Sequence, residues 1–137
     1  MILKNCTPGF SLVEVIIACV IIGLLATLAI PQFSRVKERS VDKEAIGYLS
    51  ALQAAERMYF TEREVYYPSP AVATNVVTDI NTNLQVNLPT GTNPKWTYTV
   101  SSTGGVSALR NGGSRQWDLA ITADTATCTP GASDPCR

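Results

Sequence analysis

One carboxylate, Glu14, stands at the start of an apolar stretch and is the residue most able to do chemistry in this chain. From Val15 to Ile30 the sequence contains no ionisable group except Cys19. A carboxylate near a membrane interior costs on the order of a few kcal/mol unless it is protonated or paired, or reaches the headgroup layer. A pairing cation belongs near Phe10, one helical turn earlier, and the sequence has none there. A new amino terminus at Phe10 would supply it.

The other residue types exclude most kinds of catalysis. The chain has no histidine, which excludes Ser/His and Cys/His catalysis and histidine metal ligands. Its 11 basic and 11 acidic residues give a formal net charge of zero, which does not favour binding to nucleic acid. The spacing of Asp118, Asp124 and Asp134 fits no known calcium loop. We therefore predict no enzyme activity, no metal site, no cofactor and no nucleic-acid partner.

The element that must position Glu14 is the apolar segment Phe10–Ile30. As a helix of ~1.5 Å per residue it would span about 32 Å, close to the thickness of a bilayer core. Three interpretations are open: a cleaved secretory signal, a lipoprotein signal ending at Cys19, and a retained membrane-spanning helix. In the first, Lys4 is the only charged residue of the leader. In the second, the residues after Cys19 remain apolar where a lipid-anchored chain normally becomes polar.

The segment from Gly9 to Glu14, followed by the apolar run, resembles the class III signal of type IV prepilins and related pseudopilins. The resemblance covers roughly residues 4–35, and the rest of the chain matches only in its layout. It implies a leader over residues 1–9, cleavage by prepilin peptidase between Gly9 and Phe10, and N-methylation of Phe10. Pro31 falls where many pilins have a helix-bending proline. A proline also removes a backbone donor, so a bend or a locally unwound stretch is expected there.

Elementary electrostatics agrees with this resemblance. A cut before the apolar helix keeps that helix in the product and creates a cation beside Glu14, at the positive end of the helix dipole. Within one chain Phe10 and Glu14 form an i,i+4 pair. Between chains, the terminal amine of one subunit meets Glu14 of a neighbour, which would set the axial register of a helical bundle. We take Glu14 as the assembly residue.

A second, amphipathic half of the helix is expected to run to about residue 62 and to pack under a globular head. Its apolar stripe consists of Phe33, Val36, Val41, Ala45, Leu49, Leu52, Ala55 and Tyr59. The charged residues between Arg35 and Glu44 fall mostly on other faces. They form a solvated surface, or else pair with other subunits in a filament or contact lipid headgroups.

The head, residues 63–137, changes to a period of two. Residues 95–101 place Trp96, Tyr98 and Val100 on one face, and residues 116–122 place Trp117, Leu119 and Ile121 on one face. A third strand is expected over residues 106–110, whereas residues 66–94 are expected to be irregular, with a short strand or turn near residues 84–88. These elements predict an α+β fold in which a small antiparallel meander packs on the long helix. The two tryptophans are expected in the core.

The C-terminal cysteines Cys128 and Cys136 are expected to form a disulfide around a turn at Pro130 and Gly131. Cys6 leaves with the leader and Cys19 lies in the apolar segment, so this is the remaining intrachain pair. A disulfide indicates an oxidising compartment. Many type IV pilins have such a loop, whereas major pseudopilins usually lack it and often carry a calcium site there.

These observations predict a structural subunit of a type IV pilus that polymerises with itself and other pilins. Its other partners would be prepilin peptidase, the assembly machinery and membrane lipid. The precursor would lie in the bacterial inner membrane with its head outside the cytoplasm, although the basic residues after the helix would by themselves place the head inside. The alternatives are a pseudopilin of a type II secretion system, forming a periplasmic pseudopilus, and a single-span or lipid-anchored envelope protein that never polymerises.

Overall fold

The computed structural model describes residues 9–132 and 134–136, except for the side chains of residues 28–31. A long helix comes first, followed by a short strand, a short helix and four more strands. The elements are α1 (Leu12–Arg63), β1 (Ala73–Thr74), α2 (Val77–Leu84), β2 (Trp96–Ser101), β3 (Val106–Arg110), β4 (Gln116–Leu119) and β5 (Thr127–Thr129). The chain divides into two units, one up to Lys37 and one from Glu38 onward. The predicted α+β class is confirmed.

The first unit contains the apolar part of α1. The helix begins at Leu12 rather than Phe10 and is continuous through Pro31. Pro31 lies within residues 28–31, whose side chains are not described. The helix bend expected at Pro31 stays a prediction. The stripe predicted to pack under the head does not extend into this unit, because Phe33 and Val36 are 73% and 61% exposed.

Both ends of α1 follow the usual rules for helix termination. Glu14 lies in the first turn and Arg63 in the last, where each charge opposes the helix dipole. Immediately after the helix, Glu64 adopts a left-handed conformation with φ 59°. Its backbone N–H donates to the carbonyl of Phe60 at 2.8 Å, which satisfies one of the last free carbonyls. The end of α1 is therefore set by local backbone geometry, five residues before Pro68.

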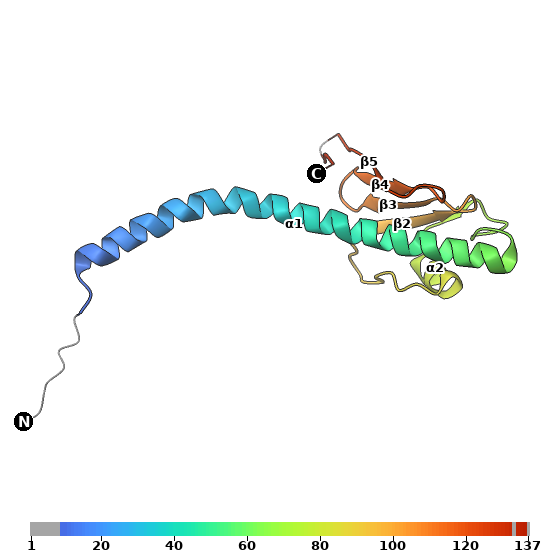
Figure 1. The fold of residues 1–137 in the computed structure, drawn as a ribbon, viewed down its shortest axis with the longest axis horizontal. Coiled ribbons are helices and arrows are strands. Elements are labelled where there is room, and N and C mark those ends of the chain that lie inside the picture. The colour runs from blue at the N-terminus through green and yellow to red at the C-terminus, as the bar shows by residue number, and fades with distance from the viewer. Residues whose placement is uncertain (1–8, 133, 137) are drawn as a thin grey trace, which may run out of the picture. The chain divides into compact units, whose positions relative to one another are not determined.

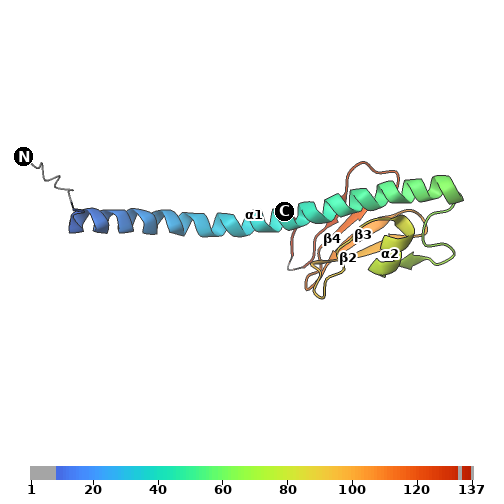
Figure 2. The same ribbon diagram turned by 90° about the horizontal axis from the view of Figure 1, so that it is seen from below.

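The second unit is built on an antiparallel meander in the order β1-β2-β3-β4-β5. Each strand pairs with the next in sequence, and Val100 of β2 lies opposite Val106 of β3, which lies opposite Leu119 of β4. The turn between β2 and β3 requires Gly104, which has φ +77°, and a Cβ there would lie 2.9 Å from the ring of Tyr66. Figure 1 and Figure 2 show the sheet beside the second half of α1, with α2 nearby.

The core of this unit lies between α1 and one face of the sheet. Alternate residues of β2 are buried, so the predicted apolar face of Trp96, Tyr98 and Val100 is confirmed. Trp117 is half-buried and packs against the core from β4. The helix contributes the middle of its predicted stripe, where the buried residues are Val41, Ala45, Leu49 and Leu52. Such a small sheet depends on the helix for its stability.

Several features of the head differ from the sequence prediction. Residues 66–94 are not wholly irregular, because they contain β1 and the helix α2, whose Ile80 and Leu84 enter the core. No strand forms at residues 84–88: α2 ends at Leu84, and Gln85 follows in a left-handed conformation with φ 53°. The last predicted strand ends at Leu119 instead of residue 122, and β5 adds an edge strand beside it.

Candidate functional site

The residues at the predicted processing junction lie outside the helix. Gly9, Phe10 and Ser11 precede α1, and the side chain of Phe10 is 83% exposed. The carbonyl of Ser11 accepts the first hydrogen bonds of the helix, from Glu14 N at 3.1 Å and Val15 N at 3.3 Å. Among the described residues, a Cβ at Gly9 would meet no atom within 4 Å.

Glu14 lies in the first turn of α1 and is exposed. Within the described residues it forms no ion pair. The side chains that follow it are apolar around the whole helix: those from Leu12 to Leu25 with large apolar groups are 50–73% exposed. An apolar helix that is exposed all round must be covered by lipid or by protein.

A test of length and hydropathy gives a mixed result for this segment. Among the described residues no single helix is both long and apolar enough to cross a membrane. The helical segments Leu12–Thr27 and Gln32–Arg63 meet the same test when they are taken together.

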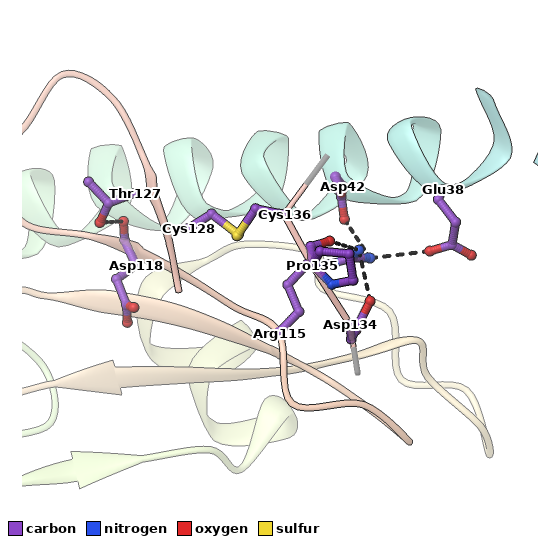
Figure 3. Close-up of a disulfide and its surroundings, with 9 residues drawn as sticks. All are labelled: Glu38, Asp42, Arg115, Asp118, Thr127, Cys128, Asp134, Pro135 and Cys136. Carbon is purple, nitrogen blue, oxygen red and sulfur yellow. Dashed lines mark hydrogen bonds and ion pairs between the residues drawn. A yellow bond between two sulfur atoms is a disulfide. The ribbon is translucent and has the colours of Figure 1, made fainter. Parts of the chain in front are cut away.

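A second polar site lies in the other unit, at the start of its part of α1. The side chain of Arg115, just before β4, is 1% exposed and is surrounded by carboxylates (Figure 3). Its Nη2 lies 2.9 Å from Asp42 Oδ1 and 3.2 Å from Glu38 Oε2, both on α1. Its Nη1 lies 2.9 Å from Asp134 Oδ1 and donates to the carbonyl of Pro135 at 3.0 Å. Arg115 thus ties the C-terminal loop to the helix.

An aromatic ring and a second arginine complete this cluster. The guanidinium carbons of Arg115 and Arg110 lie 5.8 and 5.4 Å from the ring centroid of Trp96, within cation–π range. Arg110 Nη2 also lies 3.4 Å from Glu38. The indole Nε1 of Trp96 donates to the carbonyl of Val41 at 3.2 Å. Strand β2, the β3–β4 region and the helix therefore meet around one buried cation.

The buried carboxylate Asp42 is the least favourable member of the cluster. Burial raises its pKa above the usual value of 3.8, and the nearby charge of Arg115 only partly opposes this. Neither of its two buried oxygens has a hydrogen-bond partner among the described residues, so the close approach of Arg115 is an ion pair lacking hydrogen-bond geometry. A buried pair of this kind gives little net stability, but loss of either partner is costly.

The predicted disulfide between Cys128 and Cys136 is confirmed, and it closes the loop that presents Asp134 to Arg115 (Figure 3). Cys128 lies in β5 opposite Trp117 of β4, which anchors one end of the loop on the sheet. Gly131 is needed at its turn, because a Cβ there would clash with the side chain and backbone of Ser114. The bond therefore limits how far Asp134 can move from its partner.

A third buried polar group, Glu56, lies further along α1. It is completely buried, and burial raises its pKa from 4.5 to about 7. One oxygen accepts a hydrogen bond from the backbone N–H of Tyr67 at 3.1 Å, and the other has no partner among the described residues. One turn earlier, Gln53 Nε2 donates to the carbonyls of Ala120 and Ala123 at 2.7 Å each. These side chains hold the segments that follow α1 and β4 against the helix.

Sequence reasoning proposed processing and assembly roles for Gly9, Phe10 and Glu14, and these roles stay predictions. It predicted the cysteine pair correctly but missed the role of Arg115. The structure places Asp134, weighed as a calcium ligand, on the Arg115 guanidinium instead. Asp118 accepts a hydrogen bond from Gln116 at 2.6 Å. No three potential ligands in the described part of the chain are grouped to hold a metal ion. Nothing in the local sequence around Arg115 marks it, because its partners come from residues 38–42 and 134–135.

Comparison with known proteins gives the same picture of the N-terminal segment. The family profile described as the prokaryotic N-terminal methylation motif matches residues 5–30. The fimbrial protein EcpC of Eikenella corrodens is 30% identical over 135 residues, which cover 89% of this chain and 88% of that protein. That match therefore includes most of the head as well as the helix.

Two further relatives match over a shorter stretch. The type IV major pilin protein PilA of Myxococcus xanthus is 43% identical over 58 residues, 42% of this chain and 26% of its own length. The type II secretion system core protein G of Aeromonas hydrophila is 36% identical over 63 residues, 46% of this chain and 44% of its own length. The matched part thus spans less than half of either relative. No solved structure is significantly similar to the chain.

Proposed function

The chain belongs to the type IV pilin-like proteins, and from that premise we propose that it is a structural subunit of a type IV pilus. The observation that carries the proposal is the apolar helix exposed on all sides, which begins at Leu12, two residues after Phe10, and bears Glu14 in its first turn. The methylation motif matched at residues 5–30 covers this same segment. A filament of such helices would cover their apolar surface by packing copies together. No catalytic step is part of the proposal.

Processing is the first step of this function. Prepilin peptidase would cut between Gly9 and Phe10 and methylate the new amine of Phe10. Both residues precede the helix, and Phe10 is largely exposed, so no packing within the described part of the chain would have to be undone. The cut would leave the apolar helix in the product and place a positive charge at the helix N-terminus, near the carboxylate of Glu14.

Glu14 would then set the register of assembly. A carboxylate that leaves the headgroup region for a packed helical bundle needs a cation, because burial of an unpaired charge is costly. The terminal amine of a neighbouring subunit would provide it at one axial offset only. Van der Waals packing between the apolar helices would favour assembly. Because this packing is not directional, it would not by itself fix the axial offset between subunits. The pair would select one offset among many.

The location of the chain would change with assembly. The precursor would be held in the bacterial inner membrane by the apolar segment, with its head outside the cytoplasm, where the Cys128–Cys136 disulfide can form. Assembly machinery in that membrane would transfer the processed subunit into a pilus together with other pilins.

A second candidate is a pseudopilin of a type II secretion system. It is favoured by the 36% identity to core protein G, although that match covers 46% of this chain. The match to the fimbrial protein covers 89% of this chain, and thus much of the head, which favours the pilus. The C-terminal disulfide also fits the pilin layout better than that of the major pseudopilins.

Electron microscopy of the cell surface with an antibody to the head separates the two candidates. Long surface fibres that carry the antibody along their length, and that disappear when the gene is deleted, support the pilus. Labelling confined to the periplasm with no surface fibre, together with loss of protein secretion on deletion, would contradict the pilus and support the pseudopilin.

A further inference from the structure

A basic segment follows the apolar part of α1. Its net charge is almost zero in the sequence, but the structure pairs its acidic side chains with cations elsewhere in the head. Residues 35–44 contain four basic and three acidic residues. We define the basic segment by its four cations, Arg35, Lys37, Arg39 and Lys43. All four are exposed.

The three acids in this stretch are already occupied by the head. Glu38 pairs with Arg110 and Arg115 at 3.4 and 3.2 Å, and Asp42 pairs with Arg115 at 2.9 Å. Glu44 lies 3.5 Å from Lys95. The carboxylates therefore neutralise cations of the β-sheet and its turns, and they are not available to the bases beside them on the helix.

The bases of the segment have no such partners. In residues 9–132 and 134–136 none of the four forms an ion pair. Arg39 and Lys43 are four residues apart on one face of α1, and like charges at that spacing repel each other. A stretch that is almost neutral in sequence therefore presents an uncompensated positive surface, which calls for an anionic partner.

The position of the segment along the chain indicates which anion. Arg35 follows Ile30, the last residue of the apolar segment, by five positions in the sequence, and Lys43 follows it by thirteen. Clusters of four or more bases beside a membrane helix are known to attract anionic lipids at the cytoplasmic leaflet, and the same charge attraction acts on anionic lipids in the outer leaflet, which this segment would face. Long basic side chains reach the headgroups while their stems lie along apolar surface.

We propose that the basic segment binds the phosphate groups of anionic phospholipids while the subunit is held in the membrane. This inference rests on the membrane-bound stage of the proposed function and adds a partner to it. The acidic side chains of this stretch pair with cations of the head, whereas its basic side chains would contact the lipid phosphates. Because the cations are exposed and form no ion pair with any described residue, none of the ion pairs found in the head has to break for this binding.

The test uses the full chain reconstituted in phosphatidylcholine vesicles that contain a trace of spin-labelled lipid. The fraction of label immobilised by the protein is compared for phosphatidylglycerol and phosphatidylcholine labels, which gives a relative association constant. The wild-type chain should prefer phosphatidylglycerol by about fivefold or more, the factor expected from even one base near an anionic surface. The preference should vanish in 1 M NaCl, where the screening length falls to about 3 Å.

Matched variants assign the preference to this segment. The variant R35Q/K37Q/R39Q/K43Q should lose it, and R39Q/K43Q should reduce it. R57Q/R63Q removes two exposed charges from the other end of α1 and should retain it. An equal effect of R39Q/K43Q and R57Q/R63Q, or a wild-type chain without preference, would overturn the proposal. So would association between protein copies that is salt-sensitive and shows no lipid preference.

A separate measurement keeps this proposal distinct from the proposed function. Carbonate extraction of the same vesicles reports whether the chain is inserted at all. A chain that resists extraction but shows no lipid preference overturns the headgroup site alone. A chain that carbonate removes contradicts the membrane-bound stage, and with it both proposals.

Discussion

Replacement of Glu56 by glutamine should remove a pH dependence of stability that the structure places in the head. Glu56 is fully buried, and only one of its two oxygens has a partner, the backbone N–H of Tyr67. Glutamine has nearly the same shape, and its carbonyl can accept the same hydrogen bond. The substitution therefore changes the titration of this site while leaving the packing in place.

The sign and size of the effect follow from the pKa. Burial raises the pKa of Glu56 from 4.5 to about 7, so the folded state holds its proton over a range in which the unfolded state has released it. The stabilisation by this proton is complete below pH 4.5 and is lost as the pH rises to about 7. The loss amounts to about 3 kcal/mol over that interval. Above pH 7 no further change is expected from this residue.

The assay is urea unfolding of the full chain in detergent micelles, followed by the fluorescence of Trp96 and Trp117, at pH 4.5, 6 and 8. The difference in free energy of unfolding between E56Q and the wild type should shift by about 3 kcal/mol in favour of the variant between pH 4.5 and 8. The control E62Q changes an exposed glutamate six positions later on α1 and should follow the wild type. Parallel curves for E56Q and the wild type would refute the assignment.

Three further predictions concern the ion cluster and the N-terminal segment. Arg115→Met leaves Asp42 buried without its cation and should reduce the free energy of unfolding by about 3–5 kcal/mol in the same assay. The double variant R115M/D42L should recover part of this loss. A loss no greater than that of an exposed substitution would contradict the role of the cluster. Gly9→Leu should leave the precursor uncut in the membrane, seen as a larger band on immunoblots, and normal processing would move the junction elsewhere. Glu14→Ala should be cut normally but fail to form filaments, or form them slowly, in a shearing assay; a normal yield of filaments would remove its role in register.

Local sequence patterns predicted the parts of the fold that depend on periodicity. The period of two in residues 95–101 matches β2, and the residues facing the helix are those expected. The spacing of Val41, Ala45, Leu49 and Leu52 likewise identified the buried side of α1. Phe33 and Val36 continue the same spacing but are exposed. Their burial was predicted wrongly because an apolar stripe in the sequence does not show where the surface that covers it ends.

The missed elements are those with weak local signals. Helix α2 is rich in threonine, asparagine and β-branched residues, which are poor helix formers, and only Ile80 and Leu84 at i,i+4 indicate its buried face. Strands β1 and β5 have two and three residues, too few for a period to be recognised. Their formation depends on neighbours that are already in place.

The polar interior was the least predictable part of the chain. The segment from residue 35 to 44 looked like a solvated helix face, yet Asp42 is buried and Glu38 faces two arginines. Their partner Arg115 is more than 70 residues away in sequence. Such pairs form only when the sheet docks on the helix, so no local pattern encodes them.

The mass of the mature amino terminus tests the central claim most directly. The protein isolated from the envelope or from sheared fibres should begin at Phe10 and carry one additional methyl group on its terminal nitrogen. An amino terminus that still includes residues 1–9, or one that starts at a lipid-modified Cys19, would contradict it.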